Sequence, residues 1–510
     1  MSRLKPWVKI ALIVLIVGGL AIFFLKSNSK STSTKSESKG FSLFGSGDGD
    51  VINVGVNTYA GFLQLVWLNG GLEPNETCPL YKNYGLKMKI SIYDDFTAGR
   101  AAFKNGDLDM IYCTTDVLCT EMGQGSDMTD AREFMMLDKS RGADVIVVNK
   151  NIKTVADLKG KRIAYAEGTV SQTLLLNVLE TNGIKGNEIE HVKVGSGIDA
   201  AEAYKSGNCD ACVTWAPLDM DCIDAVKGSK SIISTKQASE LSSDGLIAKA
   251  SYIEENKETL TKFVSAVLYA NTMVANDEKA LKEGAEIFAK AFEGFKPQDV
   301  IDGSKNVRYV TLGDEINYFG LSSSFSGVTA EQVYSKMARV YESLGLTKSP
   351  LPWRKVGDTS IIEALMADPT QVAGNQDPEG EVKFTAPTKE LETTEAISNK
   401  KITIEFGTNS STLGNDARSL IDREFGVLAK QFRNARVRVE GNTDAVGDAE
   451  YNRKLSLHRA QAVVDYLVSE YGFDPNRFVV VGNGPKHAIA NGVSGPSAEY
   501  RVTDFEFLSE

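Results

Sequence analysis

The chain has 510 residues, which is too long for one hydrophobic core and predicts about three or four domains of ordinary size. Its hydrophobic fraction of 42% and charged fraction of 24% are typical of folded globular protein. The formal net charge of −11 argues against nucleic acid as a partner, because no domain-wide basic face is available to bind phosphates.

Residues 1–25 are predicted to be a transmembrane anchor. The uninterrupted apolar stretch Ile10–Leu25 approaches the length that spans a bilayer. A cleaved signal peptide is the alternative, but neither a small-residue cleavage site nor a lipid-attachment cysteine follows the stretch. Positive charges are nearly balanced on its two sides, so charge alone does not orient it. Residues 26–50, rich in Ser, Lys and Gly, are predicted to be a flexible linker.

Residues 51–365 alternate predicted strands with helices, which indicates an α/β fold with mainly parallel sheets. The predicted strands Val51–Val56 and Leu108–Cys113 run directly into polar turns. Ligands in open α/β sheets bind beyond the carboxyl ends of strands. These turns therefore supply candidate ligand-binding residues, namely Thr58, Tyr59, Thr115 and Asp116.

A third polar turn follows the predicted strand Arg162–Tyr165 and opens a helix that continues to about Thr181. It contains Gly168, Thr169, Val170 and Ser171. Its backbone N–H groups and two hydroxyls could bind an anion, although an ordinary helix cap explains the same residues.

Several short motifs in this part of the chain resemble periplasmic solute-binding proteins of the nitrate, sulfonate and taurine class. They are the segment Asp144–Gly183, the "small-Gly-x-x-Asp" helix ends within residues 103–109 and 204–211, and Trp215-Ala216-Pro217. The resemblance implies a type II periplasmic-binding-protein-like domain. Its two lobes would close on a small solute and deliver it to a transporter, with an ABC-type permease as the candidate partner.

Carried onto this chain, the resemblance implies a cleft between the lobes. The implied lining is Thr58, Tyr59, Thr115 and Asp116 from one lobe and Gly168, Thr169, Val170, Ser171 and Trp215 from the other. Arg141, at the expected crossover, is a candidate for an anionic group on the ligand, although an ordinary solvated arginine is the alternative. Asp219 would repel an anion and leaves room for a zwitterion or an amine. We expect an anionic or zwitterionic solute.

The chain shows no catalytic constellation, so we expect neither enzyme activity nor a cofactor. Its three histidines lack metal-ligand spacing, and no nucleotide-binding or nucleophile motif is present. Six cysteines fall in the middle domain, and spacing does not resolve their pairing. Cys209 and Cys212 have the Cys-x-x-Cys spacing of a redox or zinc site, but no second pair completes a zinc cage, so no metal is expected.

Residues 366–400 are polar and rich in Pro, Glu and Thr, and are predicted to be a second linker. The remaining residues, 401–510, predict a separate domain with a strand at Ile402–Phe406 and a helix near Asn415–Phe432. Asp444, at the end of another predicted strand, and Arg459, on the helix that follows, could face one site. Such a pair could hold a ligand carrying an ammonium and a carboxylate, or could form a salt bridge that only joins strand to helix.

The residues of this last domain resemble the peptidoglycan-binding signature of OmpA-like domains. The matching residues are Thr443, Asp444, Asn452, Leu455, Ser456, Arg459 and Ala460. The resemblance implies a β-α-β-α-β-β order, with Asp444 and Arg459 binding the diaminopimelate of the peptidoglycan stem peptide. Arg501 also matches, but Glu499-Tyr500-Arg501-Val502 stands where the family has Asn-Arg-Arg-Val, so an Asn and an Arg are missing.

Together these features predict a single-pass protein of the inner membrane of a Gram-negative-type envelope. Because peptidoglycan lies outside that membrane, both large domains would be periplasmic, and the receptor would be tethered to the wall. One alternative is a structural scaffold that joins membrane to wall through a ligand-free receptor-like domain. A redox protein that uses Cys209 and Cys212 is another.

Overall fold

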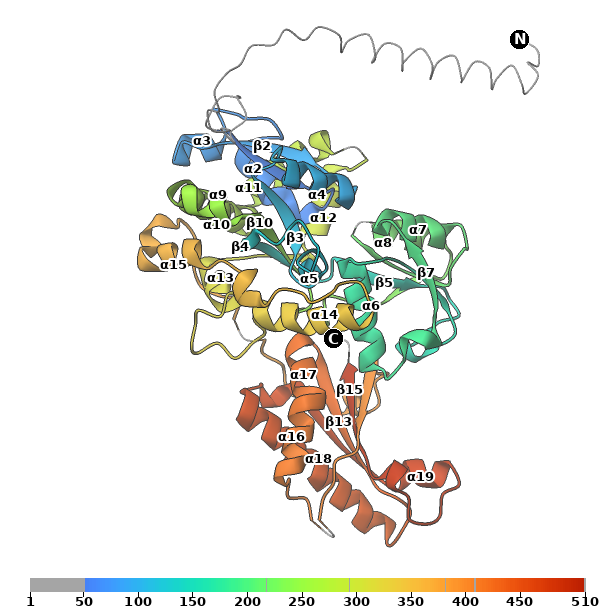
Figure 1. Cartoon of the computed structure of the whole chain (residues 1–510). Coiled ribbons are helices and arrows are strands. Elements are labelled where there is room, and N and C mark those ends of the chain that lie inside the picture. The colour runs from blue at the N-terminus through green and yellow to red at the C-terminus, as the bar shows by residue number, and fades with distance from the viewer. Residues whose placement is uncertain (1–50, 217, 293, 381, 408–409, 509–510) are drawn as a thin grey trace, which may run out of the picture. The chain divides into compact units, whose positions relative to one another are not determined.

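The computed structural model describes residues 51–216, 218–292, 294–380, 382–407 and 410–508 (Figure 1). The predicted anchor, residues 1–25, and the predicted linker, residues 26–50, lie outside these ranges. Among these described residues, no helix combines the length and the apolar character needed to span a membrane.

The first lobe is built on a six-stranded sheet of order β11-β4-β10-β3-β1-β2. Its strands are β1 (Val51–Val56), β2 (Lys87–Ile92), β3 (Met110–Thr114), β4 (Ala131–Ser140), β10 (Ser243–Lys249) and β11 (Val307–Tyr309). β1 pairs in parallel with β2 and β3, whereas β10 runs antiparallel to β3 and β4. Its helices include α2 (Leu63–Asn69), α4 (Phe96–Asn105), α10 (Lys257–Asn276) and α11 (Glu278–Ala291).

The second lobe has a five-stranded sheet of order β7-β6-β8-β5-β9. Its strands are β5 (Asp144–Val148), β6 (Arg162–Ala166), β7 (Glu190–Val194), β8 (Ala211–Trp215) and β9 (Lys230–Ser234). Its main helices are α6 (Val170–Thr181), α7 (Gly197–Lys205) and α8 (Leu218–Ala225). β6 is parallel to β7 and β8, and β5 is antiparallel to β8 and β9.

Both sheets are therefore mixed, and the prediction of mainly parallel sheets is wrong. The cause is the pair of crossovers between lobes, from β4 to β5 and from β9 to β10. A strand that enters a lobe from the other lobe starts at the interlobe end of the sheet, so it runs against the strands that end there. β5 and β10 are these two strands, and both begin beside the space between the lobes.

After β11 the chain forms α13 (Leu312–Tyr318), α14 (Ala330–Ser343) and α15 (Ser360–Ala367). The side chain of Thr311 caps α13 by accepting from the backbone N–H of Asp314, and Thr329 caps α14 through Gln332 in the same way. α13 and α15 pack against β4, so this part of the chain returns to the first lobe.

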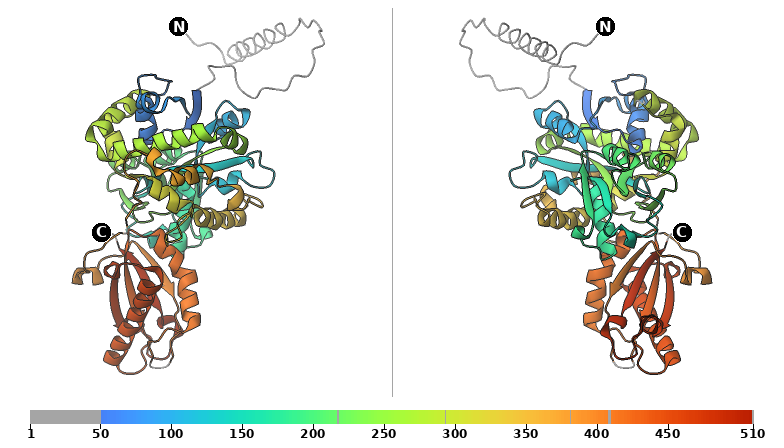
Figure 2. Two further views of the ribbon diagram at one scale, coloured as in Figure 1. Left: turned by 90° about the vertical axis from the view of Figure 1, so that its left-hand side faces the viewer. Right: turned by 90° about the vertical axis from the view of Figure 1, so that its right-hand side faces the viewer.

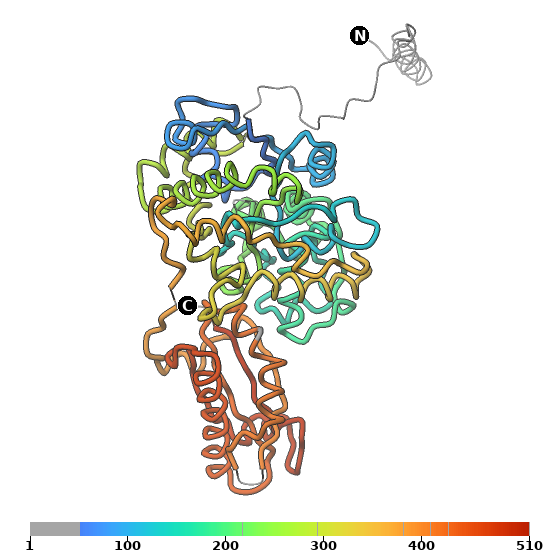
Figure 3. The backbone as a smooth tube through the Cα atoms, turned by 60° about the vertical axis from the view of Figure 1, so that its left-hand side comes forward, coloured from blue at the N-terminus to red at the C-terminus, as the bar shows by residue number. Residues whose placement is uncertain are grey.

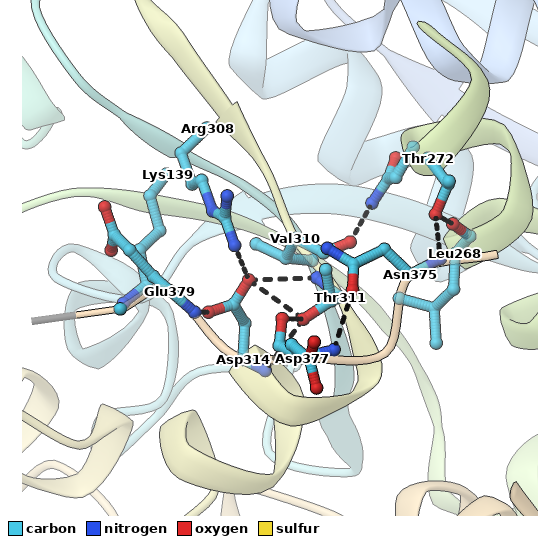
Figure 4. Close-up of polar contacts among 12 residues, drawn as sticks. Lys139, Leu268, Thr272, Arg308, Val310, Thr311, Asp314, Asn375, Asp377 and Glu379 are labelled. Atoms are coloured by element: carbon cyan, nitrogen blue, oxygen red, sulfur yellow. Dashed lines mark hydrogen bonds and ion pairs between the residues drawn. The ribbon is translucent and has the colours of Figure 1, made fainter. Parts of the chain in front are cut away.

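Residues 371–379 of the segment predicted as the second linker lie along the first lobe, and residues 384–394 contact the last domain (Figure 3). Asp314 is the centre of its attachment: its carboxylate accepts from the backbone N–H of Glu379 at 2.6 Å and from Arg308 at 2.8 Å. The Thr311 hydroxyl donates to the carbonyl of Asp377 at 2.7 Å. Figure 4 shows these contacts together. A polar composition predicts solvation, but here polar groups of the segment find partners on the lobe instead.

The last domain has a four-stranded sheet of order β12-β15-β13-β14 (Figure 2). Its strands are β12 (Ser398–Ile402), β13 (Arg436–Asn442), β14 (Phe478–Gly484) and β15 (Thr503–Leu508). α16 (Asn415–Ile421) continues through a π-helical turn into α17 (Val427–Gln431), and α18 (Ala449–Tyr471) packs on β13 and β14. The observed order is the predicted β-α-β-α-β-β, with a short helix, α19 (Lys486–Ala490), inserted before the last strand.

Candidate functional site

A cavity of about 240 Å³ lies between the two lobes. It is found where β1, β3, β6 and β8 end and where β5 and β10 begin. The lining residues are Asn57, Tyr59, Phe96, Thr97, Arg100, Tyr112, Thr114, Val117, Glu121, Asp144, Glu167, Gly168, Thr169, Val170, Gly195, Trp215, Ser242 and Asp244.

Five of the predicted ligand-binding residues line this cavity. They are Tyr59, Gly168, Thr169, Val170 and Trp215. The Thr169 hydroxyl accepts from the backbone N–H of Ser171 and caps α6, so the ordinary cap is present. The Trp215 indole lies against Gly197, where a Cβ atom would be 2.2 Å from the ring. A glycine at this position is therefore needed to leave room for the indole beside the cavity.

The other five predicted residues do not line it. Thr58 is held by Asp94, which accepts from its backbone N–H at 2.7 Å and from its hydroxyl at 2.9 Å. Thr115, Asp116 and Ser171 are buried beneath the cavity wall. On β3 it is Thr114 that lines the cavity, whereas the hydroxyl of the next residue, Thr115, donates to Glu133 at 2.9 Å inside the lobe.

Arg141 is also absent from the lining, and its guanidinium is engaged elsewhere. It contacts Glu240 at 2.9 Å and Glu379 at 2.6 Å, and it donates to the carbonyl of Ser239. Glu240 lies on the return crossover and Glu379 on the docked linker segment. Arg141 therefore connects the two crossovers and the linker, and it is not free to bind a solute.

Two aspartates that the sequence analysis missed, Asp144 and Asp244, lie on the cavity wall. Both are buried, with 6% and 8% of their surface exposed. Burial raises the pKa of Asp144 to about 6. Burial, together with the nearby charges of Asp144 and Asp116, raises the pKa of Asp244 well above its ordinary value. The signal in the sequence was an acidic residue opening the otherwise apolar strand Asp144–Val148.

Aromatic rings form much of the remaining wall. Phe96 and Tyr112 lie with ring centroids 6.0 Å apart, and Tyr59 and Trp215 complete the set. The phenol oxygens of Tyr59 and Tyr112 are buried and have no hydrogen-bond partner among the described residues. Such groups are costly to bury unpaired, which makes them candidates for ligand contacts.

The cysteines of the receptor domain are all buried free thiols in the structure. The Sγ atoms of Cys212 and Cys222 lie 3.9 Å apart, so the near neighbour of Cys212 is Cys222 on α8. Within the described ranges, the side chains of His, Cys, Asp and Glu form no group of three or more suited to a metal ion.

In the last domain, Asp444 stands at the end of β13 with little exposed surface. Its carboxylate accepts from Arg501 at 2.9 Å and from the backbone N–H groups of Val446 and Ser497, each at 3.3 Å. Asn452 donates to the carbonyl of Val446 at 2.8 Å and so holds the same loop. The Thr443 hydroxyl donates to the carbonyl of Asp444, and Leu455 is half-buried on α18.

Arg459, on α18, is not paired with Asp444 or with any other acidic side chain that the structure describes. Its Nε donates to the carbonyl of Ser410 at 3.0 Å, and its guanidinium lies 4.9 Å from the centroid of the Phe406 ring. Burial lowers the pKa of Arg459, while Tyr451 and Asp444 act in the opposite direction.

Comparison with known proteins matches both domains to families. A model described as "NMT1/THI5 like" matches residues 80–280, and the OmpA family model matches residues 405–501. The chain joins an NMT1/THI5-like domain to an OmpA-family domain. Both resemblances found in the sequence are thereby confirmed.

The relatives of the NMT1/THI5-like domain include an Escherichia coli (strain K12) protein named for binding aliphatic sulfonates. It is 43% identical over 77 residues, which are 15% of this chain and 24% of that protein. The solved structure of the periplasmic aliphatic sulphonate binding protein SsuA from Escherichia coli is 19% identical, with a TM-score of 0.48. It covers 60% of this chain and 96% of that chain.

A relative of the OmpA-family domain is outer membrane protein A of Bordetella avium. It is 40% identical over 97 residues, which are 19% of this chain and 47% of that protein. The chain thus spans about a quarter of the sulfonate-binding relative and about half of the Bordetella protein. By name, these relatives are binding and outer membrane proteins.

Proposed function

We propose that this protein is a receptor for a small solute that is tethered to the cell wall. The NMT1/THI5-like domain would bind the solute between its lobes for ABC-type transport or sensing, and the OmpA-family domain would bind peptidoglycan. The observation that carries the proposal is the cavity of about 240 Å³, which is lined by both lobes at the carboxyl ends of four strands.

The same cavity favours a receptor over a ligand-free scaffold. A scaffold needs no interlobe space, and its cleft would be filled by large side chains with their polar atoms paired. Here Tyr59 and Tyr112 border an open space with their hydroxyls unpartnered among the described residues. Lobes of this kind can close around a solute that supplies those partners.

For the wall-binding half, the supporting residues are Asp444 and Arg459. Diaminopimelate carries an ammonium and a carboxylate on one carbon, and these groups would meet the carboxylate of Asp444 and the guanidinium of Arg459. Because Arg459 has only carbonyl partners and a ring face in the described structure, its charge remains available to a carboxylate. The carboxylate of Asp444 would then have to accept hydrogen bonds from both Arg501 and the ligand ammonium.

The proposal includes a location in the cell, the inner membrane and the periplasm. The apolar stretch Ile10–Leu25 supports a single-pass anchor in the inner membrane, and a wall-binding domain requires the rest of the chain to be periplasmic. An ABC-type permease in the same membrane would then be the partner that receives the solute.

Sedimentation with purified peptidoglycan tests the wall-binding half. We expect the full chain to co-sediment and Arg459→Ala to lose about tenfold or more in affinity, since a charge-assisted hydrogen bond contributes about 1.5–3 kcal/mol. Arg423→Ala is the matched control, because Arg423 lies on the same domain with 69% of its side chain exposed. Retained sedimentation of a folded Arg459→Ala variant would show that the site lies elsewhere.

A further inference from the structure

Acidic side chains outnumber basic ones in the lining of the cavity. Its only lining cation among the described residues is Arg100, which Glu121 neutralises through two contacts of 2.6 and 2.9 Å. Glu167, another of the four acidic lining residues, pairs with Lys193 at 2.5 Å. Asp144 and Asp244 have no cationic partner among the described residues, so two carboxyl groups face the cavity without a countercharge.

The environment behind these two aspartates is also acidic. Asp138 stands opposite Asp244 in the pairing of β4 with β10, and Asp116 and Glu133 are fully buried nearby. The nearest lysine on this strand, Lys139, is bound to Glu240 at 3.0 Å. An anion entering the cavity would therefore meet acidic groups and no available cation, whereas a cation would stabilise the ionised form of these carboxyl groups and so offset the cost of burying their charge.

The aromatic wall provides a second, independent feature suited to a cation. Tyr112, which is 3% exposed, and Tyr59 present buried hydroxyl oxygens that have no hydrogen-bond partner among the described residues. Phe96 and Trp215 add ring faces to the same lining. Ring faces attract ammonium groups, most strongly where water is excluded, and a phenol oxygen can accept a hydrogen bond from an N–H donor.

Resting on the proposed receptor function, we infer that the solute carries a cationic nitrogen group, an organic ammonium or amidinium, that binds between Asp144 and Asp244. The aromatic residues Tyr59, Tyr112 and Trp215 surround its apolar part. This replaces the expectation of an anionic solute, which depended on Arg141, now engaged by Glu240 and Glu379. The cavity volume limits the solute to a small molecule.

A thermal-shift titration of the full chain tests the inference with probes of similar size and different charge. The cations are choline, butylammonium and guanidinium, the anions are propanesulfonate and nitrate, and taurine is the zwitterion. We expect at least one cation to raise the Tm in a saturable way and both anions to leave it unchanged. Taurine binding that depends on the two aspartates would support the inference as well.

The variants Asp144→Asn and Asp244→Asn, each nearly isosteric, should weaken binding of the cation about tenfold or more, as expected for loss of a charged partner. Glu188→Gln is the matched control, since it removes one negative charge from the second lobe at a residue that is paired with Lys159 and does not line the cavity. We expect it to stay within about twofold of the parent affinity. Circular dichroism and the ligand-free Tm establish that each variant is folded.

The outcomes separate the inference from the proposed function. Binding of propanesulfonate or nitrate without any cation would overturn the cationic solute and leave the receptor intact. A cation shift that is unchanged in both folded asparagine variants would also overturn it. No shift with any probe would overturn both the cationic solute and the receptor function.

Discussion

At the scale of single residues, the structure separates aspartates that look alike in the sequence. Asp444 accepts three hydrogen bonds, one of them from an arginine. Asp144 and Asp244 are buried on a cavity wall without a cation, so the folded protein disfavours their ionised forms. This difference makes stability depend on pH in a direction opposite to that of paired carboxylates.

The replacement Asp144→Asn tests this dependence. Burial raises the pKa of Asp144 from 3.8 to about 6, so between these pH values the folded state holds a proton that the unfolded state has released. The ligand-free parent should therefore lose stability relative to the variant as pH rises from about 4 to about 6, by roughly 3 kcal/mol or less. Urea unfolding of both proteins from pH 4 to pH 8 measures the difference. A difference that does not change with pH would contradict the shifted pKa.

At the scale of secondary-structure elements, the contact between β8 and α8 predicts a disulfide. The Sγ atoms of Cys212 and Cys222 are 3.9 Å apart, and side-chain rotation can bring them to a bond length of about 2.05 Å. In an oxidising compartment, a disulfide oxidant such as oxidised glutathione would accept the two electrons, with loss of both thiol protons. We expect the bond to fix α8 beside Trp215 and the cavity.

Peptide mass mapping without reduction, after equilibration with oxidised glutathione, measures this bond directly. We expect a linked peptide containing Cys212 and Cys222, and a lower Tm for Cys222→Ser under oxidising conditions, because a short disulfide-closed loop stabilises by about 2–3 kcal/mol. Cys78→Ser should leave the linked peptide unchanged. Recovery of Cys212 linked to Cys209 instead would favour the Cys-x-x-Cys pairing.

Also at this scale, the sequence predicts the strands and the OmpA-like order well, because period-two hydrophobic patterns and local motifs determine them. It does not predict which polar residues share a cavity. Asp144 and Asp244 are far apart in the chain and meet because β5 and β10 both begin at the interlobe space. Arg141 was expected in the cleft for its position at the crossover, but Glu379, from a segment predicted to be a free linker, accepts its charge.

At the scale of the whole molecule, that docked segment decides how the receptor domain continues into the wall-binding domain. A free coil between Ala367 and Lys400 would let the two domains move independently and would be cut readily by proteases. Hydrogen bonds from Asp314 and Thr311 instead hold residues 377–379 on the first lobe. We therefore expect this segment to resist proteolysis in the native protein.

The variant Asp314→Asn should weaken that attachment. It removes the carboxylate that accepts from the Glu379 backbone at 2.6 Å and pairs with Arg308 at 2.8 Å, so local opening should rise about tenfold or more. Digestion by a glutamate-specific protease, followed by mass analysis of cuts at Glu379 and Glu390, measures the opening. Asp302→Asn is the matched control, since Asp302 is an exposed aspartate paired with Lys305 on the same lobe. If the parent protein is cut at Glu379 as quickly as the variant, the segment is a free linker in solution and the two domains are joined flexibly.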